Sequence, residues 1–140
     1  MDENLLQIRG YDGSGFKPLI FFNNWRVAVL NYVDDIHPER NNKMERHTET
    51  DEVFVLIKGG GILLIGGNDS EVKEIISQEM EVGKIYNVRR NTWHTILLSR
   101  DASTLIVENR DTEIYNSEYT QLSESLHLQI LEIARNRPDI

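Results

Sequence analysis

A long series of short apolar runs is the feature that most constrains this fold. From Trp25 to about Asn109, β-branched and aliphatic residues alternate with clusters of Gly, Asn, Asp and Ser, and helical spacing is absent. Strands are predicted at residues 25–33, 43–47, 53–58, 62–65, 72–76, 85–88, 93–98 and 104–108. Eight short strands separated by turn residues indicate an all-β jelly-roll barrel, with a core at about residues 25–109.

Two glycine-rich segments fall between these runs, Gly59 to Gly61 and Gly66 to Asp69. Glycine and asparagine supply the positive φ angles that tight hairpin turns need. A phosphate-binding loop is the alternative, but such a loop leads into a helix, and the sequence here continues as strands without a Gly-Lys-Ser/Thr motif. The segments are therefore interpreted as turns.

After Asn109 the pattern changes to helical spacing. Residues 117–137 carry Leu122, Leu126, Ile130 and Ile133 three or four positions apart, and Pro138 follows. The sequence predicts a C-terminal amphipathic helix at about residues 117–137. Its apolar stripe would either cover the barrel or form part of a homodimer interface, because either buries the same face.

Length and composition exclude several classes of protein. A chain of 140 residues fits one domain, and the absence of cysteine excludes disulfides, thiolate nucleophiles and Cys-ligated metal centres. A net charge of −8 disfavours nucleic acid and anionic lipid as partners. The N-terminus is acidic and no apolar run is long enough to cross a bilayer, so we expect one soluble, cytoplasmic domain over residues 1–140.

Polar side chains fall on the inward faces of two predicted strands. Glu45 and His47 are two apart and point the same way, and Glu52 shares its face with Phe54. A carboxylate on an apolar face needs a hydrogen bond, a counter-charge or a metal. His94 likewise precedes an apolar strand, so the four residues are candidate ligands for a divalent metal such as Fe(II), Mn(II), Ni(II) or Zn(II).

The spacing of these residues resembles the cupin superfamily of RmlC-like jelly rolls. His47, Glu52 after four intervening residues and Gly59 after six more match the second His, the Glu and the closing Gly of the first cupin motif. Gly83 and His94 match the Gly and His of the second motif. The resemblance implies a double-stranded β-helix with a metal or ligand site inside the barrel.

The match has departures that bear on the metal. Glu45 stands where the family has its first His, and the opening Gly of the first motif is missing. In the second motif, Arg89 and Asn91 replace the Pro and the second Gly, and Leu98 replaces the Asn. The family's set of three His and one Glu is therefore not intact, and Glu45 would complete a site of two His and two Glu.

A narrower likeness is to ureidoglycolate lyases, cupin-like enzymes in which a Tyr precedes a short turn and a Trp-His-x-x-Leu strand. Tyr86, Trp93, His94, Leu97 and Leu98 are similar in order and spacing. The resemblance implies a lyase activity as an alternative, with Tyr86 and Trp93 as substrate-binding candidates. Such a stretch also recurs through shared barrel geometry.

Other readings of these residues stay open. The His and Glu cluster would also suit a metal-free pocket, and Glu45 would also pair with Arg46 or Lys43 at a strand end. Arg89 and Arg90 precede His94, where a guanidinium would clamp a substrate carboxylate, or they form a solvated turn. We also expect Trp25 and Trp93 to have packing roles and His37 and His127 to face solvent. Ser14 is expected to lie in a turn rather than to act as a hydrolase nucleophile.

Together these features predict a barrel that binds a small polar or anionic molecule beside a divalent metal. In an enzyme, Glu45 or Glu52 would handle protons. A non-catalytic binding or sensing module is the alternative, because cupin folds host many unrelated activities.

Overall fold

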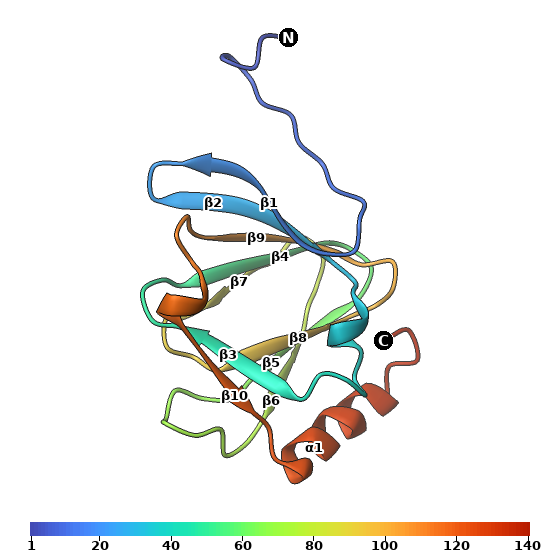
Figure 1. Cartoon of the computed structure of the whole chain (residues 1–140). Helices are drawn as coiled ribbons and strands as arrows, with labels where there is room; N and C mark the ends of the chain where they lie inside the picture. The colour runs from blue at the N-terminus through green and yellow to red at the C-terminus, as the bar shows by residue number, and fades with distance from the viewer.

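In the computed structural model, which describes residues 1–140, the chain folds into two antiparallel sheets that face each other (Figure 1). One sheet has the order β1-β2-β9-β4-β7 and the other β10-β3-β8-β5-β6. Their strands are β1 (Gly15–Phe22), β2 (Trp25–Asn31), β3 (Lys43–His47), β4 (Glu52–Lys58), β5 (Gly61–Ile65), β6 (Ile76–Glu79), β7 (Ile85–Val88), β8 (His94–Leu98), β9 (Ser103–Asn109) and β10 (Ser117–Gln121). Two short 3₁₀ turns, η1 (Asp34–Ile36) and η2 (Ile114–Asn116), and one helix, α1 (Glu124–Arg135), complete the chain. The predicted all-β jelly roll with a C-terminal helix is confirmed.

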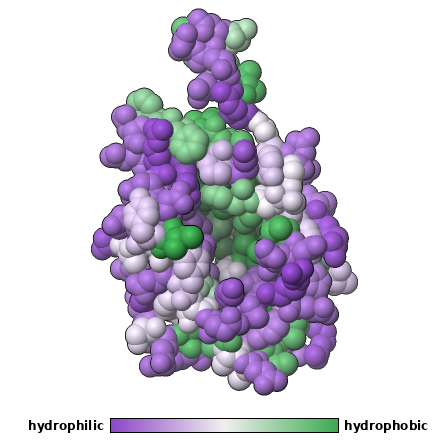
Figure 2. Space-filling model, viewed as in Figure 1, coloured by the Kyte–Doolittle hydropathy of each residue, from purple (hydrophilic) through white to green (hydrophobic).

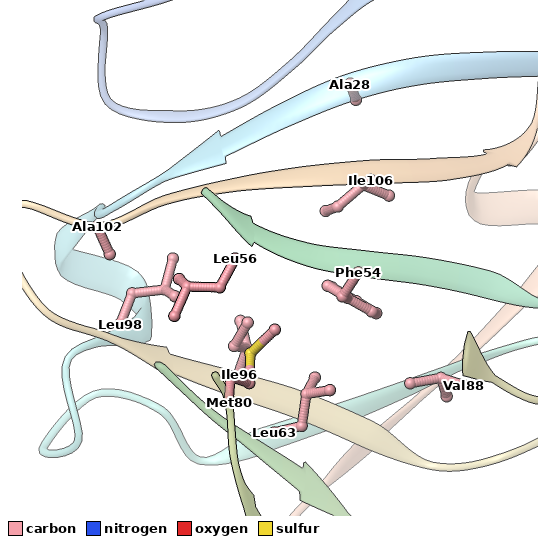
Figure 3. Packing of buried hydrophobic residues seen from close by; sticks show 10 residues of the cluster. All are labelled: Ala28, Phe54, Leu56, Leu63, Met80, Val88, Ile96, Leu98, Ala102 and Ile106. Carbon is pink, nitrogen blue, oxygen red and sulfur yellow. The ribbon is translucent and has the colours of Figure 1, made fainter. Parts of the chain in front are cut away.

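The space between the sheets is filled from alternate positions on the strands. In β4 and β9, buried residues recur at every second position, as expected for strands with one face on a core. Figure 3 shows the side chains that fill this space. They are Ala28, Phe54, Leu56, Leu63, Met80, Val88, Ile96, Leu98, Ala102 and Ile106.

A second apolar cluster lies on the other side of the β10-to-β6 sheet, under α1. Leu126 and Ile130 of the helix pack there with residues of β3, β5 and β8, among them Met44 and Leu64. The helix therefore covers the barrel, which is one of the two predicted alternatives. It is too short to span a membrane, and it is the only α-helix of the chain.

Two predicted elements begin at the wrong residue, and one strand was missed. Residues 117–121, predicted as the start of the helix, form β10 beside β3, and the helix begins only after Ser123, whose hydroxyl accepts from the Leu126 amide. The strand predicted at 72–76 begins instead at Ile76. Strand β1 was not predicted; it is an edge strand with an irregularity next to Pro18, which weakens its sequence pattern.

The predicted turn at Gly59 is confirmed, but it is not a hairpin, because β4 and β5 belong to different sheets. Gly59, between β4 and β5, has a φ of +78°, and a Cβ there would lie 2.6 Å from the Cα of Ala102. Positive φ and this close approach both exclude a larger residue without strain. The turn thus fixes how β4 passes into the opposite sheet.

Candidate functional site

The four predicted ligands come from three strands that meet at one end of the barrel. Glu45 and His47 lie on β3, and β3 pairs with β8 so that Glu45 stands directly opposite His94. Glu52 begins β4 in the other sheet. The site therefore bridges the two sheets, which explains why residues up to 49 positions apart in sequence converge.

One oxygen or nitrogen from each of Glu45, His47, Glu52 and His94 lies within 4.8 Å of the others. His47 Nε2 is 2.7 Å from Glu52 Oε2 and 3.8 Å from Glu45 Oε1. His94 Nε2 is 3.5 Å from Glu52 Oε1 and 4.0 Å from Glu45 Oε1. These atoms form one compact donor cluster, which could hold a metal ion.

The outer nitrogens of both imidazoles are hydrogen-bonded, so that each Nε2 faces the cluster. His94 Nδ1 is 2.8 Å from the Thr92 carbonyl oxygen, and His47 Nδ1 is 2.8 Å from the Ser117 hydroxyl. Because a carbonyl can only accept, Nδ1 of His94 carries the proton. In neutral His94, Nε2 then carries an unprotonated lone pair, and this buried atom has no hydrogen-bond partner.

Burial and charge shift the pKa values of the cluster in a consistent pattern. Burial opposes the charged form of His94, but the contacts with Glu52 and Glu45 outweigh it and raise the pKa of His94 to about 9. For Glu52 burial again opposes ionisation, yet His47 and His94 hold its pKa well below the usual value. Burial and then the Glu52 charge raise the pKa of Glu45. At neutral pH His94 therefore holds a proton, whereas Glu52 stays an ionised carboxylate.

Sequence reasoning missed two charged residues of the site, Glu108 on β9 and Arg26 on β2. They are cross-strand partners, and the Arg26 guanidinium donates to Glu108 Oε1 from Nη2 at 2.8 Å and from Nε at 3.2 Å. Glu108 also lies 3.8 Å from His47 Nε2. Its position two residues after Ile106 on an inward face was the signal that could have found it, as it found Glu52.

The cluster forms the floor of a cavity of about 550 Å³, a size that suits a small molecule. Figure 2 shows the hollowed face, with apolar residues inside and hydrophilic ones around the rim. Part of the wall is apolar, from Phe16, Leu30, Ile36, Phe54, Ile96 and Ile106. Five carboxylates also line it, Asp35, Glu45, Glu52, Glu108 and Glu113, against two permanent cations, Arg26 and Lys43.

The structure does not bring the predicted substrate-binding residues to this cavity. Arg89 is exposed and pairs with Asp51, and Arg90 is exposed in the same turn. The Tyr86 hydroxyl accepts from the Glu81 amide. Trp93 is buried under Arg46, with its indole N–H donating to a backbone carbonyl, so its predicted packing role is confirmed.

Two histidines predicted to face solvent are instead partly buried. His127 on α1 lies with Nε2 2.8 Å from the Pro38 carbonyl oxygen, which ties the helix to the segment before β3. His37 is half-buried, and its Nδ1 accepts from the Glu39 amide. The prediction for His127 failed because its contact with Pro38 joins segments that are distant in sequence, which leaves no local pattern. Neither residue lines the cavity.

Comparison with known proteins points to the fold. No protein-family model matches the sequence, and no curated protein sequence matches it significantly. Among solved structures, the nucleoside dehydratase Pac13 of Streptomyces is 10% identical, with a TM-score of 0.52, over 82% of this chain and 86% of that chain. The chain has the cupin fold.

A second cupin neighbour is the capsular polysaccharide assembling protein CapF of Staphylococcus aureus. It is 17% identical with a TM-score of 0.56, and the match covers 82% of this chain but only 33% of CapF. A cupin-2 domain protein of Shewanella frigidimarina, 19% identical with a TM-score of 0.46, matches 70% of this chain and 84% of its own. At such identities the cupin neighbours share the barrel, and the chemistry must be argued from the site itself.

Proposed function

We propose that this cupin binds a divalent metal ion through His47, Glu52, His94 and Glu45 and holds a small polar molecule beside it in the cavity. One observation carries the proposal, the buried and unpartnered Nε2 of His94. The Thr92 carbonyl fixes the proton on Nδ1, and the lone pair of Nε2 then faces the Glu52 and Glu45 carboxylates. A lone pair aimed at carboxylates requires a cation between them, either a proton or a metal ion.

The donor set fits a metal ion in chemistry and in spacing. Atoms bound to one ion at about 2.1 Å lie about 3 to 4 Å apart, and the contacts of His47 and His94 with the two carboxylates measure 2.7 to 4.0 Å. Two imidazoles and two carboxylates suit Fe(II), Mn(II), Ni(II) or Zn(II), as the sequence predicted.

His47 can present a lone pair as well, because its outer partner is a hydroxyl. At present Nε2 is hydrogen-bonded to Glu52 while Nδ1 meets Ser117 Oγ. A serine hydroxyl both donates and accepts, so the His47 proton can move to Nδ1 without loss of that contact. Ser117 and the Thr92 carbonyl therefore act as the outer partners that metal-binding histidines use.

The cavity beside the cluster supports binding of a small molecule. The carboxylates of the cavity outnumber its cations and would repel an anionic ligand. The positive charge of the metal ion would offset this repulsion and attract such a ligand. A bound divalent ion supplies a Lewis acid toward an oxygen of such a ligand. Of the two carboxylates among these ligands, Glu45 is the more exposed, at 38% against 7% for Glu52, so proton exchange with a bound molecule falls to Glu45.

Elemental analysis after loading tests the proposal. The purified protein is stripped with a chelator, loaded separately with Mn²⁺, Ni²⁺, Zn²⁺ or, without oxygen, Fe²⁺, and then desalted. We expect about one ion per chain for at least one metal, loss of that ion in His94→Ala, and full retention in His37→Ala, a histidine outside the cavity. Wild-type protein that stays metal-free, or a His94→Ala variant that loads as well, would overturn it.

A further inference from the structure

Glu108 faces the cluster with an oxygen that nothing in the structure satisfies. Its side chain is 3% exposed, and Oε2 is buried without a hydrogen-bond partner, 3.8 Å from Nε2 of His47. A buried carboxylate oxygen without a donor is costly, because it has lost its hydrogen bonds to water. The cupin motifs place no ligand on this strand, so Glu108 is an addition to the four residues named above.

Arg26 holds Glu108 by one oxygen only. Both of its hydrogen bonds, from Nε and Nη2, go to Oε1 rather than being shared between the two oxygens. Arg26 is itself fixed by the backbone carbonyls of Thr112 and Arg110. Oε2 therefore receives no hydrogen bond from Arg26, and it lies 3.8 Å from Nε2 of His47.

The charges of the site also call for a further cation. Glu45, Glu52 and Glu108 place three carboxylates around His47, and Arg26 is the single permanent cation in contact with them. Burial and the neighbouring Glu52 raise the pKa of Glu108 to about 9, so in the metal-free protein a proton on Glu108 offsets part of this negative charge. A divalent ion would displace that proton and offset the charge in its place.

We infer that Glu108 is a further ligand of the metal ion, through Oε2, and that Arg26 is the residue that positions it. The inference rests on the proposed function, because it extends the same metal site. The donor set then comprises two imidazoles and three carboxylates. Carboxylate oxygen suits harder ions, so the site favours Mn²⁺ more than a site of three His and one Glu would.

The test measures dissociation constants of Mn²⁺ and Zn²⁺ by competition with a chromogenic chelator, with circular dichroism to confirm folding. We expect Glu108→Gln to weaken Mn²⁺ binding at least about tenfold and Zn²⁺ binding less, since zinc is satisfied by four ligands. Arg26→Met should weaken Mn²⁺ in the same direction. Glu113→Gln is the matched control, a carboxylate of the same cavity that is 60% exposed and 3.8 Å from Arg26; it should change the constant less than about twofold.

The outcomes separate this inference from the proposed function. If Glu108→Gln binds Mn²⁺ like the wild type while His94→Ala does not bind, Glu108 is not a ligand and the four-residue site stands. If Glu108→Gln and Glu113→Gln weaken binding equally, the effect comes from the overall negative charge of the cavity rather than from ligation, and the inference is again overturned. If Glu108→Gln does not fold, Glu108→Asp, which withdraws the oxygen by one methylene, replaces it with the same expectation. A wild type that binds no metal removes both proposals.

Discussion

The buried pair of Arg26 and Glu108 should couple far more strongly than a surface pair of similar geometry. Their closest atoms are 2.8 Å apart, and the two side chains are 8% and 3% exposed. For the ionised pair at that distance and an effective dielectric constant of 20, the Coulomb energy is about 6 kcal/mol. Burial and the neighbouring Glu52 raise the pKa of Glu108 to about 9, so the full energy applies only above that pH. Part of it is offset by the desolvation of both charges, and breaking buried pairs by removing one partner costs about 3–5 kcal/mol.

A double-mutant cycle on the metal-stripped protein, at a pH above the raised pKa of Glu108, measures this coupling. The free energy of unfolding in urea is determined for the wild type, Arg26→Met, Glu108→Met and the double variant. Removal of Glu108 alone also relieves its repulsion with Glu52, and the cycle cancels such single-site effects. We expect a coupling energy of about 3–5 kcal/mol, with the double variant near the wild type or above it.

The control cycle uses Arg89 and Asp51, whose closest atoms are 3.2 Å apart but whose side chains are 79% and 39% exposed. Exposed pairs contribute about 0.2–1 kcal/mol because water screens the charges. The contrast between the two cycles is therefore set by burial rather than by distance. A coupling below about 1 kcal/mol for the buried pair would refute the account of Arg26 as the fixed counter-charge of the site.

Three further predictions address the fold and the site. Ile130→Ala, at a fully buried helix position, should cost about 2–5 kcal/mol in urea unfolding, whereas Leu128→Ala, 58% exposed, should stay within about 0.5 kcal/mol; equal effects would contradict the packing of α1 on the barrel. Gly59→Ala should lower stability by more than about 1–2 kcal/mol, because its φ is +78° and the Cβ meets Ala102; an unchanged melting temperature would disprove the strain. In metal-stripped protein the pKa of His94 is raised to about 9, which contributes about 3 kcal/mol to the free energy of unfolding. This contribution is complete below pH 6.5 and is lost as the pH rises through 9. His94→Gln should therefore lose less stability than the wild type between these pH values, and parallel curves of stability against pH for the two proteins would rule out this role of His94.

The barrel could be predicted because its signals are local. Alternating burial along β4 and β9, and the glycine turn at Gly59, are each readable from a few adjacent residues. The strand at Ser117–Gln121 was lost for the opposite reason. Leu122 and Leu126 carry a helical spacing right up to it, and only pairing with β3, some 70 residues earlier, makes the preceding segment a strand.

Part of the site was also predictable, because four of its residues follow local motif spacings. Glu45, His47, Glu52 and His94 lie within known motif spacings, and the structure brings them together. Arg26 has no such spacing, and its role depends on cross-strand pairing with Glu108 on β9. Arg26 shares the inward face of β2 with Ala28, but its partner cannot be identified until the neighbouring strand β9 is placed.

The change of the family's first histidine to Glu45 and the presence of Arg26 belong to one electrostatic problem. A glutamate in place of a histidine adds a negative charge to a buried donor set, and Glu108 adds another. In the metal-free protein part of this charge is neutralised by protons, because burial and Glu52 raise the pKa of Glu108 to about 9 although Arg26 opposes the rise. Arg26, fixed by two backbone carbonyls, makes ionisation of Glu108 less costly without occupying the Glu108 oxygen that faces His47, so that a divalent ion can replace the proton there. In this way a barrel can exchange an imidazole ligand for carboxylates and still present ionised oxygen to a divalent ion.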